Sequence, residues 1–161
     1  MHNLRAISTS ITLLLGVFVA AVAIAAGPAA EGHISIIPSD VKWTDAPAIG
    51  PGTKLAVLEG DPKLAEPFTM RIKFPANFKV AIHTHPVQER VSVLSGTFYL
   101  GIGEKYDAAK AVAYPAGGFT VIPPGMHMFA FTKDEETVVQ LNGIGPWGID
   151  YLNSDEDPRK K

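Results

Sequence analysis

Short segments of alternating hydrophobic and polar residues fill most of the chain between Lys54 and Leu141. Turn-forming residues separate these segments, for example Gly60-Asp61-Pro62 and Ser95-Gly96. Many short strands with turns between them are typical of a β-sandwich or β-barrel. We therefore predict an all-β domain with strands at residues 54–59, 68–74, 78–85, 89–94, 97–101, 119–122, 128–132 and 137–141. Helical patterns are weak, and a single helical turn within residues 105–112 is the most that we expect.

The N-terminus has a different pattern. A run of sixteen uncharged and almost wholly apolar residues, 11–26, follows a short stretch with one basic residue, Arg5. Ala23-Ile24-Ala25 has the small-x-small form that signal peptidase recognises, so we predict a secretory signal peptide at residues 1–25. The run is shorter than the roughly 20 residues of a spanning helix. We therefore expect a periplasmic or secreted protein with no stable membrane span after cleavage.

About 135 residues remain after cleavage, which is a typical size for one domain. We expect an N-terminal arm at residues 26–53, a barrel at 54–145 and a C-terminal tail at 146–161. The chain has a net charge of −2 and no basic cluster within the predicted barrel, so we expect no nucleic-acid partner. It has no cysteine, and any metal must therefore be held by nitrogen, oxygen or methionine sulfur.

Two histidines, His83 and His85, occupy alternate positions of one predicted strand. Alternate side chains point to the same face of a strand, so both rings can bind one ion at about 2.1 Å. Glu89 follows on the next strand and shares its face with Val91 and Val93, which we take as the interior face. A buried carboxylate is costly unless a cation neutralises it. These residues therefore indicate a metal site, although a His-x-His pair by itself is also typical of a solvated strand.

The pattern His83-x-His85-x-x-x-Glu89, closed by Gly96, resembles the first motif of the cupin superfamily. The family's upstream glycine corresponds to Asn77, another residue that accepts a positive φ. Residues 118–125, followed by a histidine, resemble the second motif. The resemblance spans nearly the whole folded domain and implies a cupin jelly-roll barrel, also called a double-stranded β-helix. The chain is most similar to small single-domain bacterial cupins of unassigned chemistry.

The resemblance also implies a fourth metal ligand in the second motif. The family pattern Pro-x-Gly-x-x-His places it at position 128, but this chain has Met128 there and His127 one residue earlier. A shift of one residue reverses the direction of a side chain on a regular strand. We expect a shortened loop to turn His127 inward, which makes the metal ligands His83, His85, Glu89 and His127. The alternative is Met128, whose soft sulfur would favour copper.

Nitrogen and oxygen ligands without thiolate allow Mn, Fe, Ni, Zn or Cu as the divalent ion. The resemblance implies dioxygenase-, isomerase- or decarboxylase-like chemistry on a small organic molecule, hence a metal-dependent oxidoreductase or isomerase, and assigns no catalytic residue. A non-catalytic cupin that binds a small ligand or a metal is the alternative, and a metal-free barrel is a third reading. Cupins commonly pair into dimers, so we also expect a homodimer with arm and tail as candidates for exchange.

The large apolar side chains Met70, Met126, Phe129, Phe131 and Trp147 are expected to line the barrel. Such residues could also form the wall of a substrate site.

Overall fold

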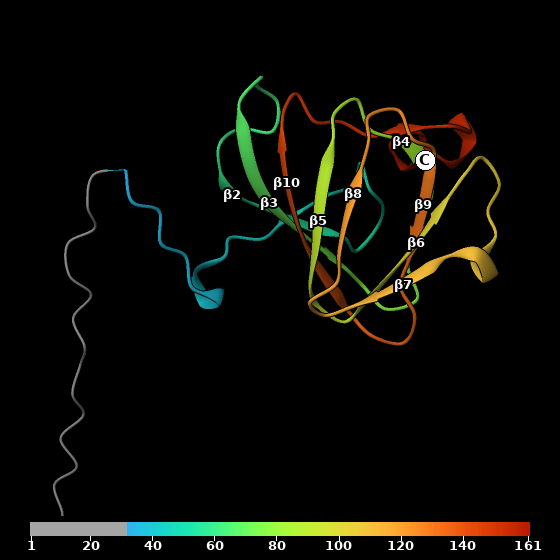
Figure 1. Ribbon diagram of the computed structural model, residues 1–161, viewed down its shortest axis with the longest axis horizontal. Helices are drawn as coiled ribbons and strands as arrows, with labels where there is room; N and C mark the ends of the chain where they lie inside the picture. Colours follow the sequence, from blue (N-terminus) through green and yellow to red (C-terminus); the bar gives the residue numbers. More distant parts are fainter. Residues whose placement is uncertain (1–31) are drawn as a thin grey trace, which may run out of the picture. The chain divides into compact units, whose positions relative to one another are not determined.

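Eleven strands, all within the described residues 32–161 of the computed structural model, form two antiparallel sheets that face each other (Figure 1). The six-stranded sheet has the order β1-β2-β3-β10-β5-β8, and the five-stranded sheet has the order β11-β4-β9-β6-β7. The strands are β1 (Thr44–Asp45), β2 (Lys54–Glu59), β3 (Pro67–Phe74), β4 (Lys79–Thr84), β5 (Glu89–Ser95), β6 (Thr97–Ile102), β7 (Val112–Pro115), β8 (Phe119–Ile122), β9 (Met128–Phe131), β10 (Thr137–Ile144) and β11 (Asp150–Tyr151).

The predicted signal peptide at residues 1–25 lies outside the described residues. Residues 34–161 form a single unit, and the all-β prediction is confirmed for it. All eight predicted strands are present, with ends within three residues of the prediction. The strands β7 and β11 were not predicted, because β7 ends in a proline and β11 has only two residues.

Four 3-10 helices complete the described chain: η1 (Pro38–Asp40), η2 (Ala108–Lys110), η3 (Ser154–Glu156) and η4 (Pro158–Lys160). Within residues 32–161, no helix has the length and apolar character needed to traverse a bilayer.

Two turns are formed as the sequence motif predicts. Asn77 has a φ of 55°, and its backbone N–H donates to the carbonyl of Lys133. Gly96 has a φ of +71° between β5 and β6, and a Cβ there would lie 2.6 Å from the carbonyl oxygen of Glu136. Only glycine fits this position without displacing the neighbouring chain.

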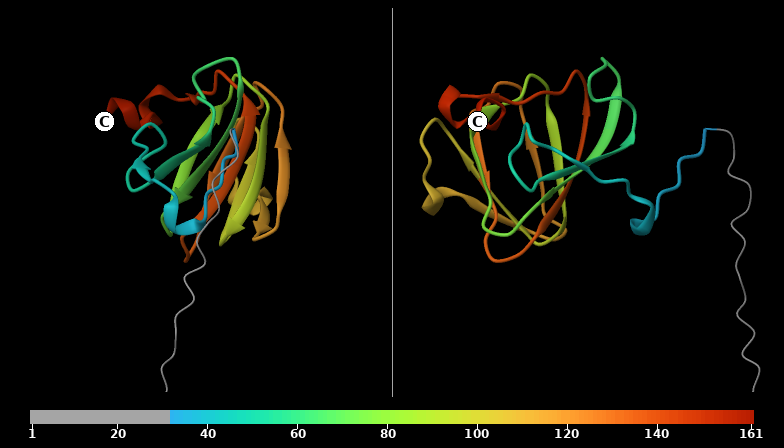
Figure 2. Two further views of the ribbon diagram at one scale, coloured as in Figure 1. Left: turned by 90° about the vertical axis from the view of Figure 1, so that its left-hand side faces the viewer. Right: turned by 180° about the vertical axis from the view of Figure 1, so that it is seen from behind.

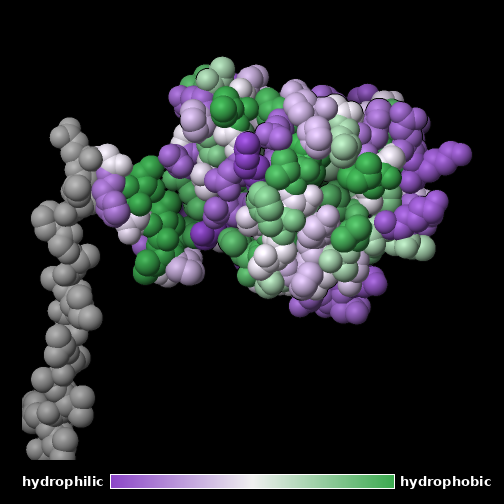
Figure 3. Space-filling view, viewed as in Figure 1, coloured by the Kyte–Doolittle hydropathy of each residue, from purple (hydrophilic) through white to green (hydrophobic). Residues whose placement is uncertain are grey.

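The core lies between the two sheets, where alternate residues of the strands meet (Figure 2). On β5, Glu89, Val91 and Val93 are buried whereas Arg90 is exposed, so the predicted interior face is correct. Exposed apolar side chains lie scattered among polar ones on the face shown in Figure 3.

Strand β9 is buried along its whole length because both of its faces are covered. Met128 and Ala130 belong to the core between the sheets. Phe129 and Phe131 point the other way and pack against the ring of Tyr106, with centroid distances of 4.5 and 6.2 Å. The prediction that these two phenylalanines line the barrel is therefore wrong. The inner face of β9 carries Met128 and Ala130 instead.

The segments that flank the predicted barrel pack onto it. In the predicted arm, Ile49 is buried in the core, and the hydroxyl of Thr53 donates to the carbonyls of Ala46 and Gly50. In the predicted tail, β11 pairs with β4. The Tyr151 hydroxyl joins the two segments because it lies 3.1–3.2 Å from the carbonyl oxygens of Ala48 and Ile49.

Candidate functional site

A cavity inside the barrel has an apolar wall and one polar end. The cavity has a volume of about 40 Å³, more than the roughly 10–15 Å³ that one buried water needs. The lining residues come from both sheets and from the two flanking segments: Ile49, Ile72, Phe74, Val80, His83, His85, Glu89, Val91, Phe98, Ile122, Met128, Ala130, Val139, Leu141, Trp147 and Ile149.

His83 reaches the cavity from β4. On a regular strand, residues three positions apart point to opposite faces. The pairing register of β4 with β9 shifts between Val80 and His83, and for this reason both side chains are buried. The Nδ1 atom of His83 lies 2.7 Å from the carbonyl oxygen of Ala81. Since a carbonyl only accepts, Nδ1 carries the proton and Nε2 keeps its lone pair. Burial, together with the nearby His85, lowers the pKa of His83 to about 3, so its ring is neutral near pH 7.

His85 follows at the end of β4 and is fixed from the C-terminal segment. Its Nδ1 lies 2.6 Å from the carbonyl oxygen of Gly148, so Nδ1 donates to this carbonyl and Nε2 is directed toward Glu89. The indole ring of Trp147 stacks on the imidazole, with a centroid distance of 5.4 Å and an interplanar angle of 22°. The ring of His83 meets that of His85 edge to face at 4.8 Å.

Glu89 begins β5 and is 2 % exposed. The indole N–H of Trp147 donates to its Oε1 atom. The other carboxylate oxygen, Oε2, lies 3.5 Å from Nε2 of His85. Burial raises the pKa of Glu89, while His85 and the Trp147 hydrogen bond oppose this rise.

The structure therefore brings His83, His85 and Glu89 into one cavity, and the protein engages one polar atom of each. Such outer hydrogen bonds are the ones that orient metal ligands. Within residues 32–161, however, no three His, Cys, Asp or Glu side chains stand close enough to form a ready-made metal group. The three side chains would have to draw together around an ion.

His127 does not join these three residues. Its side chain is 32 % exposed, and its Nδ1 lies 3.3 Å from a carboxylate oxygen of Glu104. Met128 is buried, lines the cavity and stands opposite His83 in the pairing of β9 with β4. The sequence alternative in which Met128 faces the cavity thus describes this arrangement, whereas the expected inward turn of His127 is not seen here.

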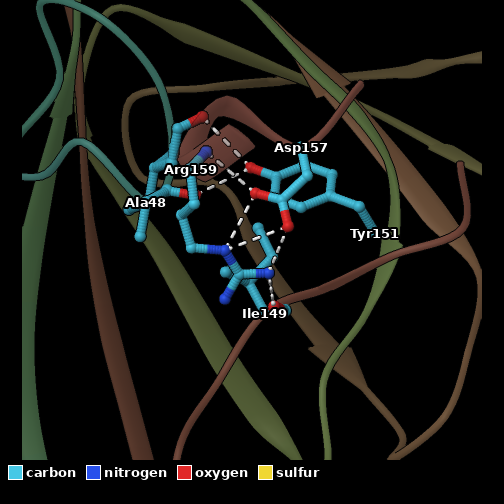
Figure 4. Close-up of polar contacts among 6 residues, drawn as sticks. Ala48, Ile149, Tyr151, Asp157 and Arg159 are labelled. Carbon is cyan, nitrogen blue, oxygen red and sulfur yellow. Dashed lines mark hydrogen bonds and ion pairs between the residues drawn. The ribbon is translucent and has the colours of Figure 1, made fainter. Parts of the chain in front are cut away.

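The C-terminal segment has a second set of polar contacts, most of them within the segment and one of them to Ala48 (Figure 4). Arg159 donates to both carboxylate oxygens of Asp157 and to the carbonyl of Ile149. The hydrogen bond from Arg159 holds the pKa of Asp157 below its ordinary value. Burial is the main reason why the pKa of Tyr151 rises to about 12, so its hydroxyl stays protonated and donates to Ala48.

Comparison with known proteins assigns the chain to a family. Residues 36–156 match the model of a domain of unknown function, DUF4437. The chain belongs to this family. A search of the curated proteins found no match.

Solved structures show that the fold is that of the RmlC-like cupins, as the sequence motifs predict. The polyketide cyclase RemF from Streptomyces resistomycificus superposes with a TM-score of 0.63 at 18% identity, over 78% of this chain and 89% of that chain. An RmlC-like cupin from Shewanella frigidimarina gives 0.55 at 18% identity, over 70% and 91%. KdgF from Halomonas sp. gives 0.53 at 17% identity, over 68% and 93%.

Sequence reasoning missed two parts of the cupin site. It expected Trp147 only as an apolar lining residue, and it did not expect its hydrogen bond to Glu89 or the contact of the Gly148 carbonyl with His85. No local pattern could have revealed either contact, because one residue pair is 58 and the other 63 positions apart.

Proposed function

We propose that this cupin holds one divalent metal ion through His83, His85 and Glu89 and acts on a small organic molecule. One observation carries the proposal. Three buried ionisable side chains meet at the end of an otherwise apolar cavity, and each has its remaining polar atom engaged by the protein. The same three residues form the first cupin motif.

The charges of the residues fit a cation. Glu89 is buried almost completely, and an ionised carboxylate at such a place is costly without a positive partner. His83 is neutral and presents an unprotonated Nε2, which is the form that binds metals, and the Nδ1 of His85 is likewise engaged by a backbone carbonyl. Two histidines and one carboxylate with open positions are typical of non-haem Fe(II) sites, and Mn, Ni, Zn and Cu accept the same donors.

The fourth ligand stays a proposal with two candidates. Met128 already lines the cavity, and its sulfur would shift the preference toward copper. His127 is the ligand that we expect from the sequence, and it would have to leave Glu104 and turn inward.

A bound ion would polarise an oxygen atom of the substrate. The protein's own contribution is to hold the three ligands in place through Ala81, Gly148 and Trp147 and to keep water away with the apolar wall. The fold is shared with proteins described as a polyketide cyclase and as DMSP lyases, which supports action on a small molecule. An oxidoreductase of the dioxygenase kind or an isomerase is the proposed class, and a non-catalytic binder of the same ligand is the alternative.

Metal analysis of the purified protein tests the site. We expect about one transition-metal ion per chain, and re-addition at a hundredfold excess over Kd should stabilise metal-free protein by about 2.7 kcal/mol, or about 5–10 °C in Tm. His83→Ala should abolish both effects, while Ala113→Val on the exposed face of β7 serves as a control. The proposal fails if Mn, Fe, Ni, Zn and Cu all leave Tm unchanged and no metal copurifies.

A second assay separates an enzyme from a binder. Metal-loaded protein is mixed with small diketones and phenols, and oxygen uptake and product formation are followed. Turnover that His83→Ala removes supports an enzyme. Saturable binding without turnover supports the alternative.

We also propose that the protein is exported, on the basis of the signal-like residues 1–25. Expression in a bacterial host, followed by mass analysis of the periplasmic fraction, should give a chain that lacks about 25 residues. An intact chain in the cytoplasm would contradict export.

A further inference from the structure

Away from its polar end, the cavity offers a ligand no charged or hydrogen-bonding side chain among the residues that the structure describes. The wall consists of aliphatic, phenylalanine and methionine side chains, such as Phe74, Phe98 and Leu141. Trp147 is the one further polar side chain in the lining, and its N–H is already used by Glu89.

The basic residues of the strands that line the cavity point away from it. Arg90 lies between Glu89 and Val91 on β5 and is exposed. Arg71 precedes the lining residue Ile72 on β3, and its guanidinium donates to Gln140 instead. Because side chains alternate along a strand, neither cation can reach a ligand inside the barrel.

The backbone offers no replacement. The strands that carry the wall pair with their neighbours, with β10 between β3 and β5 and β9 between β4 and β6, and the register shifts only beside Val80 and Val139. The paired N–H and C=O groups bind one another and are not free for a ligand. A charge placed deep in the cavity would therefore be buried without a partner, which is far more costly than burying a neutral group.

We infer that the cavity selects small molecules with one oxygen-bearing end and an uncharged, apolar remainder, the class to which alkylphenols belong. The oxygen end meets His83, His85 and Glu89, and this part rests on the proposed function. The apolar remainder lies against the wall, and the rejection of a distant charge depends on the wall alone. The cavity volume of about 40 Å³ is smaller than a phenol, so such a ligand enters only when side chains of the lining move apart.

A pair of ligands that differ only in distant charge tests this inference. 4-Ethylphenol and 4-hydroxybenzylammonium have the same phenol and nearly the same shape, but a methyl group in one is an ammonium group in the other. Both are titrated into the metal-loaded full chain, where a bound cation would prevent Glu89 from attracting the ammonium. Binding is followed by the quenching of Trp147 fluorescence in a Trp43→Phe background and by the change in Tm.

An anionic ligand is measured separately. 4-Hydroxybenzoate is added to metal-free protein, in which no cation can capture its carboxylate, and 4-ethylphenol is added under the same conditions. We expect 4-ethylphenol to bind at least tenfold more tightly than the charged ligand in each comparison. Equal or tighter binding of either charged ligand would overturn the inference, and so would the absence of 4-ethylphenol binding in both forms of the protein.

A variant locates the bound ligand. Ala130 lines the cavity from β9, and Ala130→Val narrows it by a small amount that the fold should tolerate. Affinity for 4-ethylphenol should fall at least fivefold, while Ala113→Val, the same change at an exposed position of β7, should leave it unchanged. Unchanged affinity in a folded Ala130→Val protein would place the ligand elsewhere and overturn the inference.

The two proposals can fail independently. Metal binding with no preference for the neutral ligand would refute the inference and leave the proposed metal site intact. A preference for the neutral ligand in a protein that binds no metal would refute the proposed metal site and leave the inference intact.

Discussion

The indole N–H of Trp147 donates a hydrogen bond to the carboxylate of Glu89, and the same indole ring stacks on His85. One side chain from the C-terminal segment thus touches two of the three candidate metal ligands. Partners of this kind orient a ligand and fix which of its atoms faces the metal. We therefore expect Trp147 to act as a positioning residue for the proposed site.

Trp147→Phe should keep the stacking and remove the donor. We expect metal affinity to fall by about 10–100-fold, the usual effect of losing an outer hydrogen bond to a ligand. Competition with a chelator measures this affinity. Trp43→Phe is the control, because Trp43 lies beside Lys73 and does not line the cavity. Wild-type affinity in Trp147→Phe would show that the hydrogen bond does not position Glu89.

Glu89→Gln should remove metal binding but stabilise the metal-free protein at neutral and higher pH. The pKa of Glu89 is raised by burial in the folded state, so the folded protein holds its proton more tightly than the unfolded chain. Stability of the metal-free wild type therefore decreases as pH rises above about 4.5 and through the folded pKa. Thermal melts between pH 4 and 8 should show that the difference in Tm between Glu89→Gln and the wild type grows in favour of the variant as pH rises. A constant difference across this range would contradict the prediction.

His83 should have the opposite effect, because it should make the metal-free protein less stable as the pH falls. Its pKa is 6.5 in the unfolded chain and about 3 in the folded one, so the unfolded chain binds the extra proton in this interval. The contribution of neutral His83 to the unfolding free energy is fully present above pH 6.5 and is lost as the pH falls toward 3. At about 1.4 kcal/mol per pKa unit, this contribution is about 5 kcal/mol. Denaturant melts of metal-free His83→Asn should show a flatter decrease between pH 6.5 and 4. His127→Asn, which changes a partly exposed ring outside the cavity, is the control. Equal slopes in wild type and His83→Asn would refute this cause.

The second motif can be tested by comparing two neighbouring residues. Because the His127 ring is partly exposed and lies beside Glu104, we expect His127→Ala to keep metal affinity within about twofold. Met128→Leu conserves the volume of the wall and removes the sulfur, so a lower copper affinity there would identify Met128 as a ligand. A tenfold loss in His127→Ala would instead support the expected ligand set of His83, His85, Glu89 and His127.

Tyr151→Phe should loosen the segment that carries Trp147 and Gly148. The lost hydroxyl hydrogen bond to Ala48 or Ile49 should cost about 1 kcal/mol of unfolding free energy. In this variant, backbone amide hydrogen exchange should accelerate more in residues 147–151 than in the rest of the domain. Tyr106→Phe alters the tyrosine that packs against Phe129 and Phe131, and it is the matched control. Equal exchange rates in these residues for wild type and Tyr151→Phe would exclude a fastening role.

Much of the fold follows from the sequence alone. The alternation of apolar and polar residues locates eight strands, and it places Glu89 on the buried face of β5 with Val91. The His-x-His spacing also puts two imidazoles on one side of β4. These features are local, because a strand repeats every two residues and its apolar side must be buried.

Tertiary structure decided the rest. The register of β9 directs Met128 inward and His127 outward, and this register depends on pairing with β4 and β6 rather than on the motif itself. The contacts of Trp147 and Gly148 depend on a C-terminal segment that returns to the barrel and is held there by long-range hydrogen bonds. The sequence determined which side chains could bind a metal, and only the packing of distant segments determined which of them meet in the cavity.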